Sequence, residues 1–146
     1  MIRLTDNLWV GNSADGTNLE AISVGAVLNV AHDLLGEVGW PKVEYMQVGL
    51  VDGPGNPQSA YYSAVLALHS LLKRHRTLVC CHTGGRSVAV AIMYLELCES
   101  TRGWNGWLEL LCERVCIEVP IPHPAHREAF DKMNWRSMSK LIGVAQ

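Results

Sequence analysis

The residues that decide the fold of this chain are 77–95, which read TLVCCHTGGRSVAVAIMYL. Thr77–Val79 is a short apolar run typical of a β-strand, Cys80–Arg86 is a polar segment with two glycines, and the apolar residues from Ser87 onward are typical of a buried helix. A strand, a tight loop and a helix N-terminus together form an anion site, because free backbone N–H groups and the positive end of the helix dipole point toward one place. We therefore expect residues 80–87 to bind an anionic group.

Two side-chain types in this loop add chemistry to the anion site. A thiol at the start of such a loop is favoured as a thiolate and becomes a nucleophile. Arg86, at the end of the loop, offers a planar guanidinium that suits two phosphate oxygens. Five residues separate Cys80 from Arg86, whereas four separate Cys81 from Arg86. The pattern indicates a cysteine-dependent phosphatase and leaves open which cysteine attacks.

The composition of the chain is that of one globular domain. It has 146 residues, of which 49% are apolar and 18% charged, and it is long enough to bury a core. The formal net charge of −2 gives no general attraction to nucleic acid or to an acidic membrane, so we expect neither as a partner. No apolar run approaches the roughly 20 residues that span a bilayer. Residues 1–6 do not resemble a signal peptide, and we expect a cytoplasmic protein.

The five cysteines predict neither a disulfide framework nor a metal site. Their number is odd and nothing in the sequence indicates secretion, so we expect reduced thiols. Cys112, Cys116, His123 and His126 are residue types that bind zinc, but their spacing matches no common zinc motif. Cys112 and Cys116 would share one face of a helix, where core packing accounts for them. We expect no metal and no other cofactor.

Strands and helices alternate along the chain, which predicts an α/β fold with a mostly parallel central sheet flanked by helices, in a single domain. The apolar runs predict strands at Leu8–Val10, Ala26–Val30, Val43–Leu50 and Thr77–Val79. Asn56 and Pro57 are typical of the N-cap and first position of a helix, and apolar residues recur at helical spacing from there to residue 72. Two further helices are expected, at about 104–113 and 125–140.

Four segments of the chain, in this order, resemble the small dual-specificity phosphatases of the protein tyrosine phosphatase superfamily. They are residues 7–12, residues 27–31, Tyr45–Asp52 and Cys80–Ser87. The segment 114–122, followed by Phe130, loosely resembles the C-terminal end of that family. The order and spacing of the segments carry the resemblance, because each segment alone is a weak signal.

The resemblance implies a phosphatase that acts on phosphotyrosine or on phosphoserine and phosphothreonine through a thiophosphate intermediate. The loop cysteine would attack phosphorus, while backbone N–H groups and the Arg86 guanidinium hold the phosphate oxygens. Asp52 matches the general acid that protonates the leaving alcohol, and Ser87 matches a hydroxyl that assists departure of the thiolate. The expected substrate is a phosphorylated protein or a small phosphomonoester. The substrate-binding residues of the loop would be Cys81, His82, Thr83, Gly84, Gly85 and Arg86.

The loop departs from this family at the nucleophile. The family has a histidine immediately before the attacking cysteine, and here that position is Val79 if Cys80 attacks or Cys80 if Cys81 attacks. With Cys80 the loop keeps the length needed to wrap a phosphate. With Cys81 the glycine at position 84 matches the family, but the loop is one residue shorter. We favour Cys80 because of the loop length and keep Cys81 as the alternative.

Two other functions remain open. Residues 81–87 also resemble the active loop of rhodanese-type sulfurtransferases, in which four residues separate a persulfide-carrying cysteine from an arginine. No upstream segment of the chain resembles the rest of such an enzyme. The second alternative is a catalytically silent phosphate-binding module with the same fold. It is suggested by the missing histidine before the nucleophile and by loop glycines that do not match the family's positions when Cys80 is aligned with the nucleophile.

Overall fold

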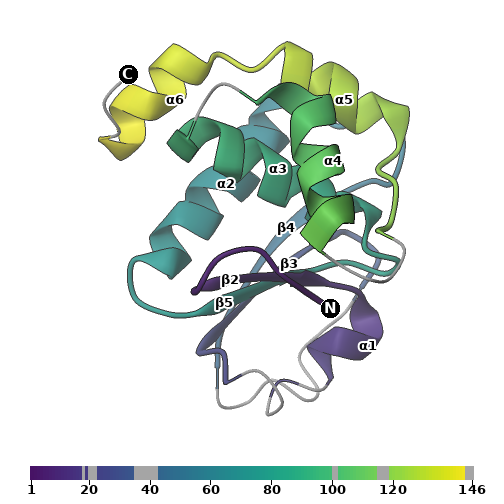
Figure 1. The fold of residues 1–146 in the computed structure, drawn as a ribbon, viewed down its shortest axis with the longest axis vertical. Coiled ribbons are helices and arrows are strands. Elements are labelled where there is room, and N and C mark those ends of the chain that lie inside the picture. Colours follow the sequence, from purple (N-terminus) through teal and green to yellow (C-terminus); the bar gives the residue numbers. More distant parts are fainter. Residues whose placement is uncertain (18, 20–22, 35–42, 100–101, 115–118, 144–146) are drawn as a thin grey trace.

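The computed structural model describes residues 1–17, 19, 23–34, 43–99, 102–114 and 119–143. Its centre is a five-stranded sheet in the order β1-β2-β5-β3-β4 (Figure 1). The first strand pairs antiparallel with β2, and the other four strands run parallel to one another. This confirms the predicted α/β class with a mostly parallel sheet. The strands are β1 (Ile2–Arg3), β2 (Leu8–Gly11), β3 (Ala26–Ala31), β4 (Glu44–Leu50) and β5 (Thr77–Cys80).

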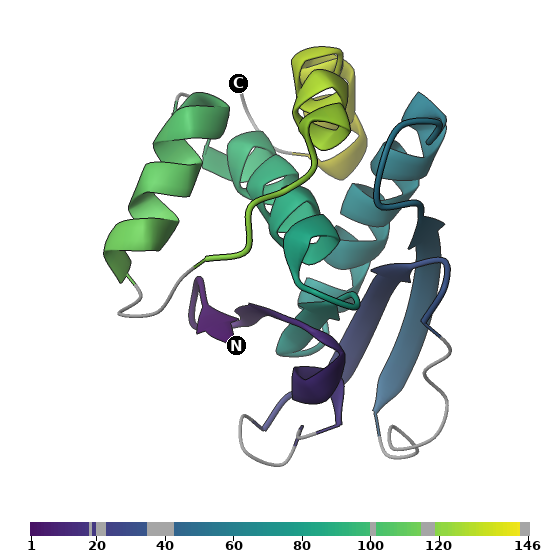
Figure 2. The same cartoon turned by 90° about the vertical axis from the view of Figure 1, so that its right-hand side faces the viewer.

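Helices α2 to α6 gather over one face of the sheet, and α3 runs through the middle of this layer (Figures 1 and 2). The short α1 lies apart from them, next to β2 and β5. Within the described ranges, none of the helices combines the length and apolar composition that a bilayer span requires. The helices are α1 (Ser13–Gly16), α2 (Gln58–Leu72), α3 (Gly85–Glu99), α4 (Gly103–Arg114), α5 (Pro124–Asp131) and α6 (Trp135–Ile142).

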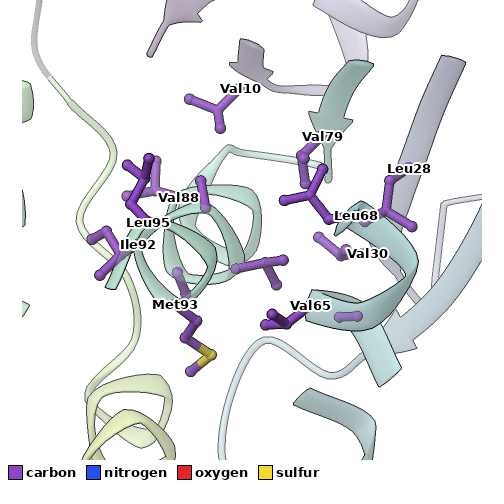
Figure 3. Close-up of a cluster of buried hydrophobic side chains, with 14 of the residues drawn as sticks. Val10, Leu28, Val30, Val65, Leu68, Val79, Val88, Ile92, Met93 and Leu95 are labelled. Atoms are coloured by element: carbon purple, nitrogen blue, oxygen red, sulfur yellow. The ribbon is translucent and has the colours of Figure 1, made fainter. Parts of the chain in front are cut away.

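The main hydrophobic core lies between the sheet and helices α2 and α3. Figure 3 shows Leu28 and Val79 from the sheet facing Leu68 from α2, with Ile92 and Met93 projecting from α3. All five side chains are fully buried. The continuous apolar runs of β3 and β5 are explained by this position, because parallel strands in the middle of a sheet are covered on both faces.

A smaller apolar cluster covers the opposite face of the sheet. Its buried members are Val24, Val27, Leu78 and Cys80. Successive side chains of a strand point to opposite faces, so Cys80 belongs to this smaller cluster while Cys81 belongs to the main core. The strand therefore separates the two candidate thiols onto different sides of the sheet.

The segment expected to form one helix at 125–140 forms two, so that prediction is wrong. The first helix ends at Asp131, and Asn134 then caps the second by accepting a hydrogen bond from the Ser137 amide at 3.0 Å. An asparagine side chain competes with the helix for backbone amides, which explains the break.

Two smaller expectations are also corrected. Pro57, not Asn56, occupies the N-cap position of α2 and makes no side-chain cap, because the Asn56 side chain binds the backbone of Val51. Cys112 is exposed on α4, so core packing does not account for it, and Cys116 lies outside the described residues.

Replacing Leu28 with alanine should lower the free energy of unfolding by about 2–5 kcal/mol, because this fully buried side chain fills the main core. The matched control is Leu141→Ala in α6, where the side chain is 71% exposed and the change should stay below about 0.5 kcal/mol. Urea unfolding of both variants measures the difference. Similar losses in the two variants would contradict the position of β3 at the centre of the core.

Candidate active site

The Cys81 sulfur lies at the turn from β5 into α3 and accepts hydrogen bonds from the backbone. The amide of Gly84 donates to this sulfur at 3.2 Å and the amide of Ser87 at 3.4 Å. The Ser87 hydroxyl oxygen lies 3.6 Å from the same sulfur and is held by the carbonyl oxygens of Gly84 and Gly11, at 2.9 and 2.8 Å. Amide donors that converge on one sulfur at a helix N-terminus stabilise a negative charge there.

The Cys80 sulfur lies in a different environment. Cys80 and Cys81 are both fully buried, but Cys80 lies in the smaller apolar cluster. Burial raises the pKa of its thiol to about 12, and the neighbouring Cys81 and Asp15 act in the same direction. An apolar surrounding disfavours the charged form of a thiol, so Cys80 stays protonated near neutral pH.

The Arg86 guanidinium links the cysteine loop to two other loops. This side chain is only 3% exposed, and its Nη1 donates to a carboxylate oxygen of Asp33 and to the carbonyl oxygen of Leu50, both at 2.8 Å. Its Nε is buried and has no acceptor among the described residues. An anionic oxygen beside Arg86 would supply that acceptor. Leu50 ends β4 and precedes the Asp52 loop, so Arg86 also joins that loop to the site.

No pattern in the sequence predicted a role for Asp33, which follows β3 and binds Arg86. Burial acts to raise the pKa of Asp33, but the Arg86 hydrogen bond and charge, a backbone hydrogen bond and the nearby His82 together lower the pKa. The buried Asn29 shapes this loop, because its side chain donates to the Leu34 carbonyl at 2.6 Å and accepts from the Ala31 amide at 2.9 Å. The contact between Asp33 and Arg86 is consistent with the topology, because β3 and β5 are parallel neighbours and the loops that follow them lie at the same edge of the sheet.

Asp52 lies on a loop that the Asn56 side chain closes. The side-chain Oδ1 of Asn56 accepts a hydrogen bond from the Val51 backbone amide, and its side-chain Nδ2 donates one to the Val51 backbone carbonyl, both at 2.8 Å. Asp52 is 44% exposed, and one of its carboxylate oxygens lies 3.3 Å from Nε2 of His126. His126 is fully buried on α5, and its Nδ1 lies 2.7 Å from the Tyr61 hydroxyl of α2. The sequence did not predict this pairing, because His126 lies 74 residues from Asp52 along the chain.

The remaining residues predicted for substrate binding lie along the same turn. His82 is partly exposed and its Nε2 lies 3.1 Å from the Asp33 carbonyl oxygen, while Thr83 is exposed. Gly84 has a φ of +100°, and a Cβ at this position would lie 2.8 Å from the Pro120 ring. Both observations require glycine here. Gly85 is buried and begins α3.

Comparisons with known proteins identify similar sequences and similar folds. No family model matches the sequence. Mouse dual specificity protein phosphatase 14 is 33% identical over 99 residues, which cover 64% of this chain and 50% of that protein. The human protein of the same name is 31% identical over an equal length. The chain is similar to the dual-specificity phosphatases. It spans about half the length of these curated relatives.

Solved structures of phosphatases share the fold over nearly the whole chain. The structure of DUSP15 superimposes with a TM-score of 0.80 at 18% identity, covering 98% of this chain and 92% of that one. Human DUSP28 gives a TM-score of 0.76 at 18% identity, with 97% and 99% covered. The P. aeruginosa protein TpbA, solved in complex with phosphotyrosine, gives 0.70 at 12% identity, with 98% and 90% covered. The fold predicted from the resemblance, that of the protein tyrosine phosphatase superfamily, is confirmed.

Replacing Asn56 with alanine should speed hydrogen exchange of the Val51 amide by about 10-fold, because the variant removes the acceptor of that amide and opens the Asp52 loop. The control is Asn134→Ala, which removes a side chain that accepts from the Ser137 amide at the start of α6 and should leave Val51 unchanged. Amide-resolved exchange by NMR measures both. Unchanged exchange at Val51 in Asn56→Ala would show that this side chain does not close the loop.

Proposed function

We propose that residues 1–146 form one catalytic domain that hydrolyses phosphomonoesters, with Cys81 as the nucleophile. The observation that carries the proposal is the convergence of the Gly84 and Ser87 amides on the Cys81 sulfur, in the same turn that leads to Arg86. This geometry moves our preference away from Cys80, the residue that loop length favoured. Cys80 lies on the other face of the sheet, where burial raises its pKa to about 12.

The first step would be attack of the Cys81 thiolate on phosphorus. A sulfur–phosphorus bond forms, the bond from phosphorus to the ester oxygen breaks, and its electron pair leaves with that oxygen. Asp52 gives its proton to the departing oxygen, which leaves as an alcohol. Arg86 and backbone N–H groups at the start of α3 would hold the remaining phosphate oxygens.

The second step would restore the thiolate. Asp52, now a carboxylate, takes a proton from water while the water oxygen attacks phosphorus. The sulfur–phosphorus bond breaks and its electron pair returns to Cys81. The Ser87 hydroxyl oxygen lies 3.6 Å from that sulfur, and its proton would turn from the Gly84 or Gly11 carbonyl toward the sulfur as the negative charge forms.

The substrate class proposed is phosphotyrosine together with phosphoserine and phosphothreonine, in a protein or as a small ester. The resemblance to dual-specificity phosphatases supports this range, and TpbA is a protein of the same fold that has been solved with phosphotyrosine. A cytoplasmic location is part of the proposal, because the reaction needs a reduced Cys81 thiol and the described cysteines are free.

One observation favours a second candidate function. If Cys81 is the reactive cysteine, four residues separate it from Arg86, the spacing of rhodanese-type sulfurtransferases. In that reaction the Cys81 thiolate would take a sulfur atom from thiosulfate, releasing sulfite, and pass it to cyanide as thiocyanate. A silent phosphate-binding module is the third candidate, supported by the engagement of Arg86 with Asp33.

Replacing Cys81 with serine should abolish hydrolysis of p-nitrophenyl phosphate, because the variant removes the thiolate that attacks phosphorus. Cys80→Ala is the matched control and should retain most of the activity, since that sulfur lies in an apolar cluster on the other face of the sheet. Steady-state release of p-nitrophenol measures both variants.

The opposite pattern would assign the nucleophile to Cys80. Thiocyanate formation from thiosulfate and cyanide, without phosphatase activity, would support the sulfurtransferase. Binding of vanadate without turnover of either substrate would support the catalytically silent phosphate-binding module.

Asp52→Asn should lower kcat for phenyl phosphate by about 100-fold, because phenoxide is a poor leaving group without a proton donor. KM should change little, since Asp52 acts mainly in the transition state. Asp6→Asn, at a side chain that is 95% exposed, controls for the loss of one carboxylate. Equal kcat values for the two variants would show that Asp52 is not the proton donor.

A further inference from the structure

The buried histidine of α5 connects the proposed general acid to helix α2. His126 has no exposed surface, its Nε2 lies 3.3 Å from Oδ1 of Asp52, and its Nδ1 lies 2.7 Å from the Tyr61 hydroxyl. The rings of Tyr61 and His126 meet edge to face, with 5.8 Å between their centres. A buried polar group of this kind is costly unless each of its polar atoms is paired, and here both ring nitrogens have partners.

The position of the proton on His126 follows from the neighbours of Tyr61. The Asn56 amide group is oriented by its two hydrogen bonds to Val51, so its NH₂ group lies 3.2 Å from the Tyr61 oxygen and donates to it. The described residues offer the Tyr61 hydroxyl proton one acceptor, which is Nδ1 of His126. If Nδ1 carried the proton instead, the buried hydroxyl would be left without an acceptor in the described part of the chain.

Neutral His126 therefore carries its proton on Nε2, the nitrogen that faces Asp52. Burial lowers the pKa of His126 and outweighs the opposite effect of the Asp52 carboxylate, so the ring stays neutral. Among the described residues, His123 at the N-cap of the same helix and Arg86 also act on the ring, and both disfavour the imidazolium. The result is an imidazole with a fixed tautomer that donates one hydrogen bond to Asp52.

We propose that His126 is a positioning residue for Asp52, an inference that rests on the proposed role of Asp52 as general acid. A side chain that is 44% exposed would otherwise rotate freely, and the hydrogen bond from Nε2 holds its Oδ1 oxygen. Oδ2 is then left to carry the transferred proton. After Oδ2 gives this proton to the leaving oxygen, the Nε2–H group stabilises the carboxylate that remains. Tyr61 acts one bond further away, because it keeps the histidine in the donating tautomer.

The test compares two substrates that differ in their need for a proton donor. Phenyl phosphate releases a phenol with a pKa of about 10, whereas p-nitrophenyl phosphate releases a more acidic phenol that leaves without much help. His126→Phe keeps a ring of similar size and removes the donor. It should lower kcat/KM for phenyl phosphate about 10-fold more than for p-nitrophenyl phosphate. His126→Gln places an amide donor near the Nε2 position and should restore most of the difference.

The Tyr61 hydroxyl has a matched control on the same helix. Tyr61→Phe removes the group that fixes the tautomer. It should change the ratio of kcat/KM for phenyl phosphate to kcat/KM for p-nitrophenyl phosphate in the same direction as His126→Phe, by about threefold. Tyr62→Phe removes a hydroxyl that accepts from the Asn134 amide at 2.7 Å, away from Asp52, and should leave the ratio unchanged. In an Asp52→Asn background, His126→Phe should have no further effect on the ratio.

Each result separates this inference from the proposed function. Equal losses for both substrates in His126→Phe, or a further change of the ratio in the Asp52→Asn background, would overturn the positioning role while leaving the phosphatase intact. A wild-type protein that hydrolyses neither substrate would contradict the phosphatase. In that case the ¹H–¹⁵N long-range spectrum of His126 decides the inference. A neutral ring protonated on Nε2 at pH 7, and loss of that single tautomer in Tyr61→Phe, would support it, whereas Nδ1 protonation would overturn it.

Discussion

The tight turn from β5 into α3 depends on Gly84. A residue with a side chain would have to adopt a φ of +100° and accept contact with the ring of Pro120, and both are unfavourable. Because glycine permits this turn, the chain reverses within four residues of Cys81, and the amides of Gly84 and Ser87 reach back to the Cys81 sulfur. The same turn starts α3 inside the main core, so the reactive group and the central helix are fixed by one local constraint.

Around this turn, the site is assembled from the carboxyl ends of neighbouring strands. The loop after β3 brings Asp33, the loop after β4 brings Asp52, and the loop after β5 brings the thiol. Arg86 holds the first two together, since it binds the Asp33 carboxylate and the Leu50 carbonyl at the same time. A single guanidinium, almost completely buried, therefore joins the loops that follow three neighbouring strands.

Much of the fold followed from local sequence patterns, because apolar runs and turn residues report directly on buried strands and their ends. The four predicted strands and the helix after residue 85 are examples. The choice between Cys80 and Cys81 could not be made from loop length, since it depends on which face of β5 each side chain occupies. Strand alternation was available as a signal, because Val79 and Cys81 share a face that Cys80 does not. The contact of Asp52 with His126, and of His126 with Tyr61, could not be predicted from the sequence, because helices α2 and α5 are brought together only by tertiary packing.

The placement of adjacent cysteines on opposite faces has a consequence for oxidative damage. Consecutive Cα atoms lie about 3.8 Å apart, which is shorter than the usual span of a disulfide, and here the two side chains also point away from each other. Cys80 is therefore not placed to act as a resolving thiol for a sulfenic acid formed on Cys81. Recovery from such oxidation would depend on an external thiol, such as glutathione, reaching the Cys81 sulfur from solvent.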